Sequence, residues 1–256
     1  MAPTLALLAS PFLGPTVWQP VAELLTRWGM RVIAAPAASA PPRTAADVLE
    51  GFLEALPADH EQEFVLVPHS NAGLYVPALA SQRRVKGFVF VDALLPAPGG
   101  RSRLAPPAAL LDVLRSRADE HGLLPPWSAW WEEADVAGLF PDRSARERVE
   151  GEQQRVPLSH FEGSMPIPAG WDHAPGAYLA FGDTYAEDRA AATRRGWPVV
   201  TVPGGRHLHM LFEPELVADQ LLSLVAAGCR QGPRSSRSSP SQSSAQDRRP
   251  GWVSRP

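Results

Sequence analysis

A serine at a sharp turn between a strand and a helix is the first residue of this sequence whose position suggests chemistry. The apolar, β-branched run 64–67 leads into Pro68, His69 and Ser70, and a helix-like stretch begins at Asn71. Such a turn exposes a serine hydroxyl at the carboxyl end of a strand, where it can act as a nucleophile. The backbone N–H of Asn71, beside the helix start, can face the negative charge that develops on a carbonyl oxygen under attack.

The same turn also has a purely structural interpretation. Serine is a good helix N-cap, and Ser70 stands where a cap would be needed. Ala72 and Gly73 are small enough for a tight turn, but Pro68 stands where a glycine is usual before a serine nucleophile. The turn by itself favours neither interpretation.

Two histidines near the last predicted helix are candidates for a general base. A strand ending at Val202 is followed by a glycine turn, His207 and His209, and Pro214 opens the helix. A neutral imidazole placed beside a serine hydroxyl can accept its proton, and without such a base serine is a poor nucleophile. The segment therefore predicts a serine–histidine pair.

Two aspartates are candidates for the acid that would orient this histidine. Asp92 ends a strand over residues 87–91, and Asp183 follows a strand over residues 177–181. Aspartate also fills turn and capping positions readily at strand ends, which is the alternative role for both. A third alternative is a weak serine–histidine pair without an acid. We give a slight preference to Asp92.

Short β-branched runs alternate with helix-like stretches along most of the chain. Strands are expected at residues 4–8, 31–34, 64–67, 87–91, 177–181 and 198–202, with helices at 16–28, 44–56, 71–81, 186–194 and 215–227. This alternation predicts the α/β class, with a mostly parallel central sheet flanked by helices. The core is expected to comprise residues 1–92 and 176–229.

Residues 93–175 interrupt the alternation with several prolines and one clear helix-like stretch, at 108–120. Because a stretch this long without regular structure is uncommon in a compact domain, we interpret it as a helical lid inserted between two strands. Its cluster of Trp127, Trp130 and Trp131 would line an apolar substrate pocket, or else pack in the core as most tryptophans do.

The residues after 229 differ from the rest in composition. Residues 230–256 contain six Arg, one Asp and eight Ser, so their net charge is +5. Since the whole chain has a net charge of −3, the first 229 residues carry a net charge of −8. So polar a tail cannot bury enough apolar surface to fold, and we expect it to be disordered. The acidic body argues against nucleic acid as a partner.

Composition and missing motifs exclude several other classes of protein. No apolar run approaches the roughly 20 residues that span a bilayer, so no membrane association is expected. The start of the chain has no basic segment typical of a secretory signal, which favours a cytoplasmic location. With Cys229 as the only cysteine, and no glycine-rich phosphate loop or histidine pair at metal spacing, neither a cofactor nor a metal is expected.

Over residues 3–228 the sequence resembles the α/β-hydrolase family, in particular esterase- or thioesterase-like members of actinobacterial type with a short lid. Residues 7–18 resemble the first strand, oxyanion loop and helix start of that family, with Ser10 and Pro11 where histidine and glycine are usual. The resemblance implies that the backbone N–H of Phe12 is a second oxyanion donor beside that of Asn71. Since proline has no N–H, a shift of one residue to Pro11 would remove this donor.

The resemblance also bears on the histidine and the acid. His207 precedes Pro214 by seven residues, as the family's catalytic histidine precedes its last helix, and this favours His207 over His209. The family usually places its acid three residues after a strand-end glycine, a position that Tyr185 occupies here after Gly182.

The resemblance implies a serine hydrolase that acts on an ester or thioester, for example in secondary metabolism, with a small-molecule or acyl or peptidyl substrate. Two alternatives share the scaffold: a lyase or epimerase, and a catalytically inactive binding protein. Fold alone does not separate these three.

Overall fold

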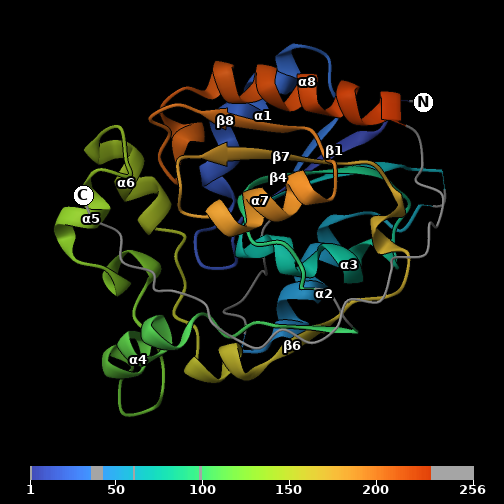
Figure 1. The fold of residues 1–256 in the computed structure, drawn as a ribbon. Helices are drawn as coiled ribbons and strands as arrows, with labels where there is room; N and C mark the ends of the chain where they lie inside the picture. Colours follow the sequence, from blue (N-terminus) through green and yellow to red (C-terminus); the bar gives the residue numbers. More distant parts are fainter. Residues whose placement is uncertain (1, 36–42, 60, 98–99, 232–256) are drawn as a thin grey trace.

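A six-stranded sheet forms the centre of the computed structural model, which describes residues 2–35, 43–59, 61–97 and 100–231 (Figure 1). The strand order is β2-β1-β3-β4-β7-β8, and each neighbouring pair is parallel. The strands are β1 (Thr4–Leu8), β2 (Val32–Ala35), β3 (Phe64–Ser70), β4 (Val85–Ala93), β7 (Gly176–Phe181) and β8 (Val199–Val202). The predicted α/β class with a mostly parallel sheet is confirmed.

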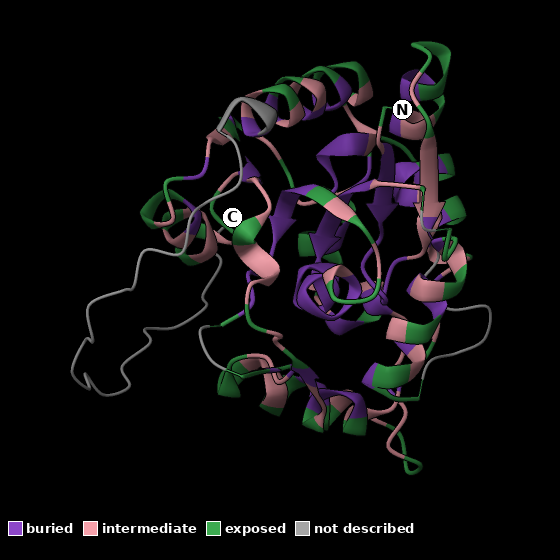
Figure 2. Cartoon of the chain, turned by 90° about the vertical axis from the view of Figure 1, so that its right-hand side faces the viewer, coloured by how far each residue is buried: buried purple, intermediate pink, exposed green. Residues whose placement is uncertain are grey.

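Helices cover both faces of this sheet (Figure 1). On one face lie α1 (Gln19–Arg27) and α8 (Pro214–Gln231), and on the other lie α2 (Ala45–Ala55), α3 (Val76–Ala80) and α7 (Ala186–Arg194). An apolar cluster lies on each face of the sheet, and successive strand residues point alternately into one and the other. In β1, Leu5 and Leu7 pack with α1, whereas Ala6 and Leu8 pack with α2. The sheet is therefore buried on both sides, as Figure 2 shows.

Two predicted helices are each split into a 3₁₀ turn and an α-helix. The predicted helix 16–28 is η1 (Pro15–Trp18) followed by α1, and the predicted helix 71–81 is η2 (Asn71–Tyr75) followed by α3. A proline, Pro20 or Pro77, lies in the first two positions of each α-helix. Proline is tolerated there because the first N–H groups of a helix have no intrahelical partner.

The strands β3 and β4 both run further than the sequence predicts, to Ser70 and to Ala93. Strand β3 passes through Pro68, whose partner on β1 is Leu8, the last residue of that strand. Proline has no backbone N–H to donate, and Pro68 lies where the hydrogen-bond ladder between β3 and β1 ends. The extension carries Ser70 to the edge where the carboxyl ends of the strands meet.

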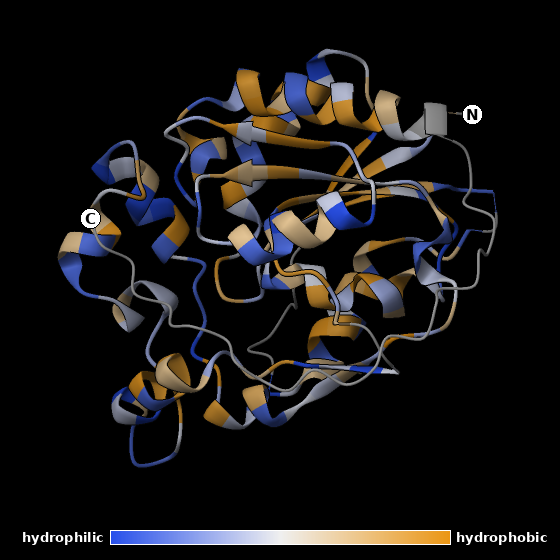
Figure 3. Cartoon of the chain, viewed as in Figure 1, coloured by the Kyte–Doolittle hydropathy of each residue, from blue (hydrophilic) through white to orange (hydrophobic). Residues whose placement is uncertain are grey.

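Residues 93–175 hold more regular structure than the single predicted helix. They contain β5 (Arg101–Arg103), α4 (Ala108–Arg117), η3 (Trp127–Trp130), α5 (Glu133–Ala137), α6 (Arg143–Glu150), η4 (Leu158–Glu162), β6 (Ser164–Pro166) and η5 (Trp171–His173). Helices α4 to α6 gather at the side of the sheet to which the β7 arrow points (Figure 1). Helix α6 carries mainly hydrophilic residues, in contrast to the central strands (Figure 3).

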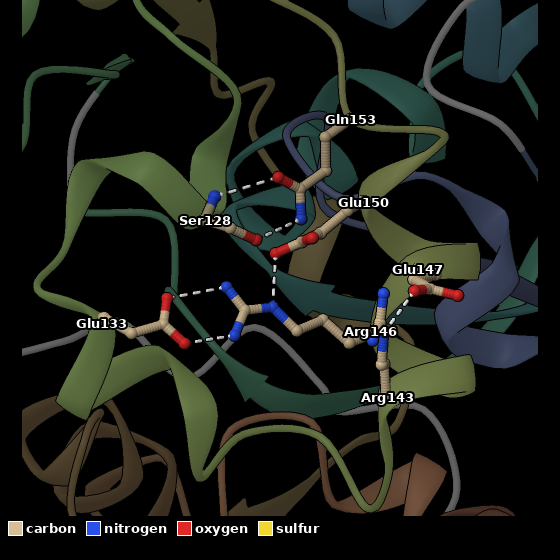
Figure 4. A network of polar contacts seen from close by, with 7 residues as sticks. All are labelled: Ser128, Glu133, Arg143, Arg146, Glu147, Glu150 and Gln153. Atoms are coloured by element: carbon tan, nitrogen blue, oxygen red, sulfur yellow. Dashed lines mark hydrogen bonds and ion pairs between the residues drawn. The ribbon is translucent and has the colours of Figure 1, made fainter.

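Polar contacts connect the short elements of this segment (Figure 4). The Arg146 guanidinium of α6 binds both carboxylate oxygens of Glu133 at the start of α5, and its Nε donates to Glu150 at 2.8 Å. Ser128 donates its backbone N–H to Gln153 Oε1 at 2.9 Å, and Gln153 Nε2 donates to the Ser128 hydroxyl at 2.9 Å. The reciprocal pair fixes the turn that carries the neighbouring Trp127.

Within the described ranges, no helix is both long and apolar enough to cross a membrane. The predicted tail lies almost wholly outside them, because helix α8 ends at Gln231 and residues 232–256 are not described.

Candidate active site

Ser70 occupies a strained backbone conformation between β3 and η2. Its φ is 56° and its ψ is −127°, a combination that costs a residue other than glycine about 1–3 kcal/mol. Its side chain caps no helical N–H, so the N-cap interpretation is wrong. The backbone carbonyl of Ser70 accepts a hydrogen bond from Leu94 N–H at 3.1 Å, which ties the turn to the chain after β4.

The side chains of Ser70, His207 and Asp92 form one hydrogen-bonded chain. His207 Nε2 lies 3.2 Å from Ser70 Oγ, and His207 Nδ1 lies 2.7 Å from Asp92 Oδ2. Asp92 is fully buried, and its other oxygen, Oδ1, accepts the backbone N–H of Phe181 at 3.0 Å. Three segments far apart in sequence thus meet at the carboxyl ends of β3, β4 and β8.

Asp92, the acceptor at the end of this series of hydrogen bonds, determines where the protons of the series lie. A carboxylate can only accept hydrogen bonds, so His207 Nδ1 donates to Asp92. In the neutral imidazole Nε2 then carries a lone pair, and Ser70 donates its proton to it. The resting geometry is that of a hydroxyl beside a base that can take its proton.

Asp92 reaches His207 because the chain turns sharply at the end of β4. Asp92 has a φ of 39°, a left-handed conformation uncommon outside glycine. Beyond it, the Tyr178 hydroxyl donates to the Ala93 carbonyl at 2.7 Å and accepts the Ala93 N–H at 3.1 Å. Burial raises the pKa of the Tyr178 phenol, so the hydroxyl keeps the proton that it donates. This clamp and the Phe181 N–H together hold the strained turn.

The two other candidates for acid and base lie outside the chain of hydrogen bonds. The Asp183 side chain is 84% exposed and pairs with Arg189 at 2.8 Å, on the surface. His209 packs its ring against Phe181 and Phe212, and its Nε2 lies 2.9 Å from the Glu213 carboxylate. The structure therefore brings Asp92 and His207 to Ser70, and not Asp183 or His209.

His69 contacts both the backbone and the ring of His207. Its Nε2 donates to the His207 backbone carbonyl at 2.9 Å, and the centroids of the two imidazole rings are 4.5 Å apart. Burial, followed by the neighbouring His207, holds the pKa of His69 well below its ordinary value, so its ring is neutral. We infer that His69 positions the loop of His207 without placing a second positive charge beside it.

The two predicted oxyanion donors follow neighbouring strands. Asn71 is the first residue of η2, and Phe12 lies in a turn after β1 in which the Leu13 N–H bonds to the Ser10 carbonyl at 3.0 Å. Within the described chain, no hydrogen bond donated by the Phe12 backbone N–H is found. Their joint role in an oxyanion hole stays a prediction.

A residue from the segment 93–175, Glu152, anchors the chain just beyond Phe12. Glu152 accepts the Thr16 backbone N–H at 2.8 Å and the Thr16 hydroxyl at 2.5 Å. A Cβ on Gly14 would lie 2.6 Å from Glu152 Oε2, so the carboxylate packs directly on this loop. The segment 93–175 thereby holds the start of η1, three residues after the candidate oxyanion donor.

The three tryptophans of the segment 93–175 make different ring contacts near the site. The Trp127 ring centroid is 6.2 Å from that of His207, and Trp131 packs edge-on against Trp127. Trp130 instead packs on Phe12, with centroids 4.9 Å apart, and donates its Nε1–H to the Pro125 carbonyl at 2.7 Å. Trp127 is thus the one of these three with a ring contact to the base, while Trp130 supports the oxyanion loop.

The sequence does not predict that Tyr185 belongs to the site. The Tyr185 hydroxyl lies 3.0 Å from Ser70 Oγ, on the segment between β7 and α7. Tyr185 stands three residues after Gly182, at the position where the α/β-hydrolase family usually carries its acid. Nothing in the sequence alone connected it to Ser70.

Gly73 is the residue of the turn that tolerates no side chain. A Cβ there would lie 2.0 Å from the Leu94 carbonyl oxygen, a backbone atom that cannot rotate away. We expect Gly73→Ala to lower the free energy of unfolding by about 3 kcal/mol or more, as severe overpacking does. Denaturant unfolding followed by circular dichroism measures this loss.

Gly138→Ala is the matched control, because a Cβ at Gly138 meets nothing within 4 Å. We expect it to change the free energy of unfolding by less than about 1 kcal/mol. Equal stability of the Gly73→Ala and Gly138→Ala proteins would contradict the tight approach of η2 to the chain after β4.

Among the residues that the structure describes, no three His, Cys, Asp or Glu side chains gather as metal ligands would.

The comparisons with known proteins agree with this fold. The model of the alpha/beta hydrolase family matches residues 7–220, and the chain belongs to that family. No curated protein is significantly similar to it in sequence.

Solved structures share the fold at low sequence identity. An extracellular α/β-hydrolase from a Paenibacillus species is 15% identical, with a TM-score of 0.70 over 87% of this chain and 99% of the other. The pyrethroid hydrolase PytH is 20% identical, with a TM-score of 0.64 over 90% and 99%. Methylketone synthase I from tomato is 17% identical, with a TM-score of 0.68 over 89% and 99%.

Proposed function

We propose that the protein is a serine hydrolase that cleaves an ester or thioester through an acyl-enzyme on Ser70. The observation that carries this proposal is the hydrogen-bonded chain from Ser70 Oγ through His207 to the buried Asp92. Membership of the family and the strained turn at Ser70 support it.

In the proposed acylation step, Ser70 Oγ attacks the carbonyl carbon of the substrate while His207 Nε2 takes the hydroxyl proton. The negative charge that forms on the carbonyl oxygen is stabilised by the N–H groups of Phe12 and Asn71. Asp92 stabilises the imidazolium through its hydrogen bond to Nδ1. His207 then protonates the leaving alcohol or thiol as its bond to carbon breaks.

In the proposed deacylation step, His207 Nε2 takes a proton from a water molecule that attacks the acyl carbon. The second tetrahedral intermediate collapses when the bond between the acyl carbon and Ser70 Oγ breaks. Ser70 Oγ receives the proton held by His207, and a free carboxylic acid leaves.

The aromatic side chains beside the base favour a substrate with an apolar group. Trp127 faces His207, and Phe12, Trp130 and Phe161 pack together at the oxyanion loop. Apolar side chains at this position favour apolar acyl or alcohol portions over charged ones. Among the solved structures with this fold, one is named a polyneuridine aldehyde esterase and another a pyrethroid hydrolase, and the first name also suggests an ester as substrate.

The test is incubation of the purified protein with a fluorophosphonate, followed by mass spectrometry of the intact chain and its peptides. We expect one stable adduct, on Ser70, because such reagents label serines activated by a base. The Ser70→Ala protein is the control and should gain no adduct.

A folded protein that takes no adduct under these conditions would contradict the proposal. The lyase, epimerase and binding-protein alternatives would then be tested with Ser70→Ala, since they predict that turnover or binding survives loss of the hydroxyl.

A further inference from the structure

We propose that Tyr185 is a further catalytic residue, whose hydroxyl donates a hydrogen bond to Ser70 Oγ and stabilises that oxygen as the leaving group of deacylation. The hydroxyl lies 3.0 Å from Ser70 Oγ, the atom that would carry the acyl group. This inference rests on the proposed function, because it concerns the breakdown of an acyl-enzyme on Ser70.

The positions of the protons at the site determine the direction of the hydrogen bond between Tyr185 and Ser70. Ser70 gives its only proton to His207 Nε2, since Nδ1 must donate to the Asp92 carboxylate. Toward any other neighbour, Ser70 Oγ can therefore only accept. The Tyr185 hydroxyl must be the donor, and the donors run in series from Tyr185 through Ser70 and His207 to Asp92.

Tyr185 is held in place by the start of α7. Its carbonyl accepts the Arg189 N–H at 2.9 Å, as the residue before that helix. In the first turn of α7, Asp188 accepts the Leu95 N–H at 2.8 Å, which docks α7 onto the chain that follows Asp92. The phenol is therefore carried by a segment fixed to the same strand end as the acid.

The surroundings of the phenol keep it protonated. Its ring centroid lies 5.7 Å from that of His207. Burial is the largest cause of the raised pKa of the Tyr185 phenol. The hydrogen bond with Ser70 opposes this rise, and the nearby Asp92 and Asp188 add to it, so that the pKa stays above its ordinary value. The hydroxyl therefore remains a donor throughout the pH range in which a histidine base works.

The chemistry needs this donor most when Ser70 Oγ departs. As the bond between the acyl carbon and Oγ breaks, the electron pair passes to Oγ, and negative charge grows there until His207 returns the proton. Tyr185 keeps its own proton and bonds to that charge more strongly than to the neutral ester oxygen. In acylation the starting state is the free Ser70 hydroxyl, to which Tyr185 already bonds and which is a better acceptor than an ester oxygen, so the hydrogen bond strengthens less on the way to the transition state.

The experiment follows 4-nitrophenyl acetate hydrolysis by the Tyr185→Phe protein in stopped flow. We expect the steady-state rate to fall about tenfold, the loss of one hydrogen bond, with the burst rate constant changed less than about threefold. Acetyl-Ser70 should accumulate in samples quenched during turnover. Tyr75→Phe, which removes a buried hydroxyl 3.4 Å from His160 Nε2, is the control and should keep the parent's ratio of the two rates.

Labelling of the parent by a fluorophosphonate separates two kinds of failure. If the parent labels on Ser70 and Tyr185→Phe shows the parent's burst and steady-state rates, the role of Tyr185 is overturned while the proposed function stands. If the folded parent does not label, the proposed function is overturned and this inference with it.

A second variant covers the case in which Tyr185→Phe does not fold. Site-specific 3-fluorotyrosine at position 185 keeps the ring and the hydroxyl, and its more acidic phenol is a stronger donor. We expect faster deacylation in this protein, and deacylation at the parent's rate would overturn the proposal.

Discussion

Replacing His207 by alanine is expected to lower kcat/KM for a reactive ester by roughly 10⁵-fold. The imidazole is the group within hydrogen-bond reach of both Ser70 Oγ and Asp92, so its loss leaves the serine without a base and the acid without a partner. Only binding and the oxyanion donors would still contribute. Hydrolysis of 4-nitrophenyl acetate, with circular dichroism to verify folding, measures the effect.

The neighbouring histidine provides a matched control. His209→Phe keeps a ring against Phe181 and Phe212 but removes both nitrogens. We expect its kcat/KM to stay within about threefold of the parent, since no ring atom of His209 bonds to Ser70 or Asp92. A comparable loss in the two variants would mean that the loop, and not the base, determines activity.

Replacing Asp92 by asparagine is expected to lower kcat by about 10³- to 10⁴-fold. The two carboxylate oxygens face two donors, His207 Nδ1–H and the Phe181 backbone N–H. An amide has only one oxygen, and because a backbone N–H cannot change its role, that oxygen must face Phe181. The amide NH₂ then faces His207 Nδ1, moves the imidazole proton to Nε2 and leaves Ser70 without an acceptor.

The exposed candidate acid tests whether this loss is specific. Asp183→Asn removes a carboxylate that is 84% exposed and paired with Arg189, so we expect kcat within about twofold of the parent. Steady-state kinetics on both proteins, with their unfolding transitions, checks the pair. A larger loss in Asp183→Asn than in Asp92→Asn would contradict the assignment of the acid.

The fold and the nucleophile–base pair could be predicted because both depend on local patterns. The alternation of β-branched runs with helices, the turn at Ser70 and the glycine turn before His207 can each be recognised within a few residues. For the acid, the sequence leaves two candidates, Asp92 and Asp183. The choice between them depends on a left-handed turn at Asp92 and on the clamp that Tyr178 forms with Ala93, 85 residues away in sequence.

The rest of the site depends on contacts that no local pattern records. Tyr185 reaches Ser70 across 115 residues, and its role depends on how α7 docks beside β4. Most of the short elements in residues 93–175 were not predicted, because proline-rich and charged segments such as 126–150 lack a sustained apolar period. Their structure depends on pairs such as Gln153 with Ser128, which are 25 residues apart in sequence.

The order of the strands also has a consequence for how the protein loses activity. Ser70 and Asp92 end two strands that pair with each other in the middle of the sheet, whereas His207 follows β8, which is paired on one side only. Edge segments open locally at a lower free energy than central ones. Fluctuations that release the edge would remove the base while nucleophile and acid stay in place, so catalytic competence is less durable than the fold itself.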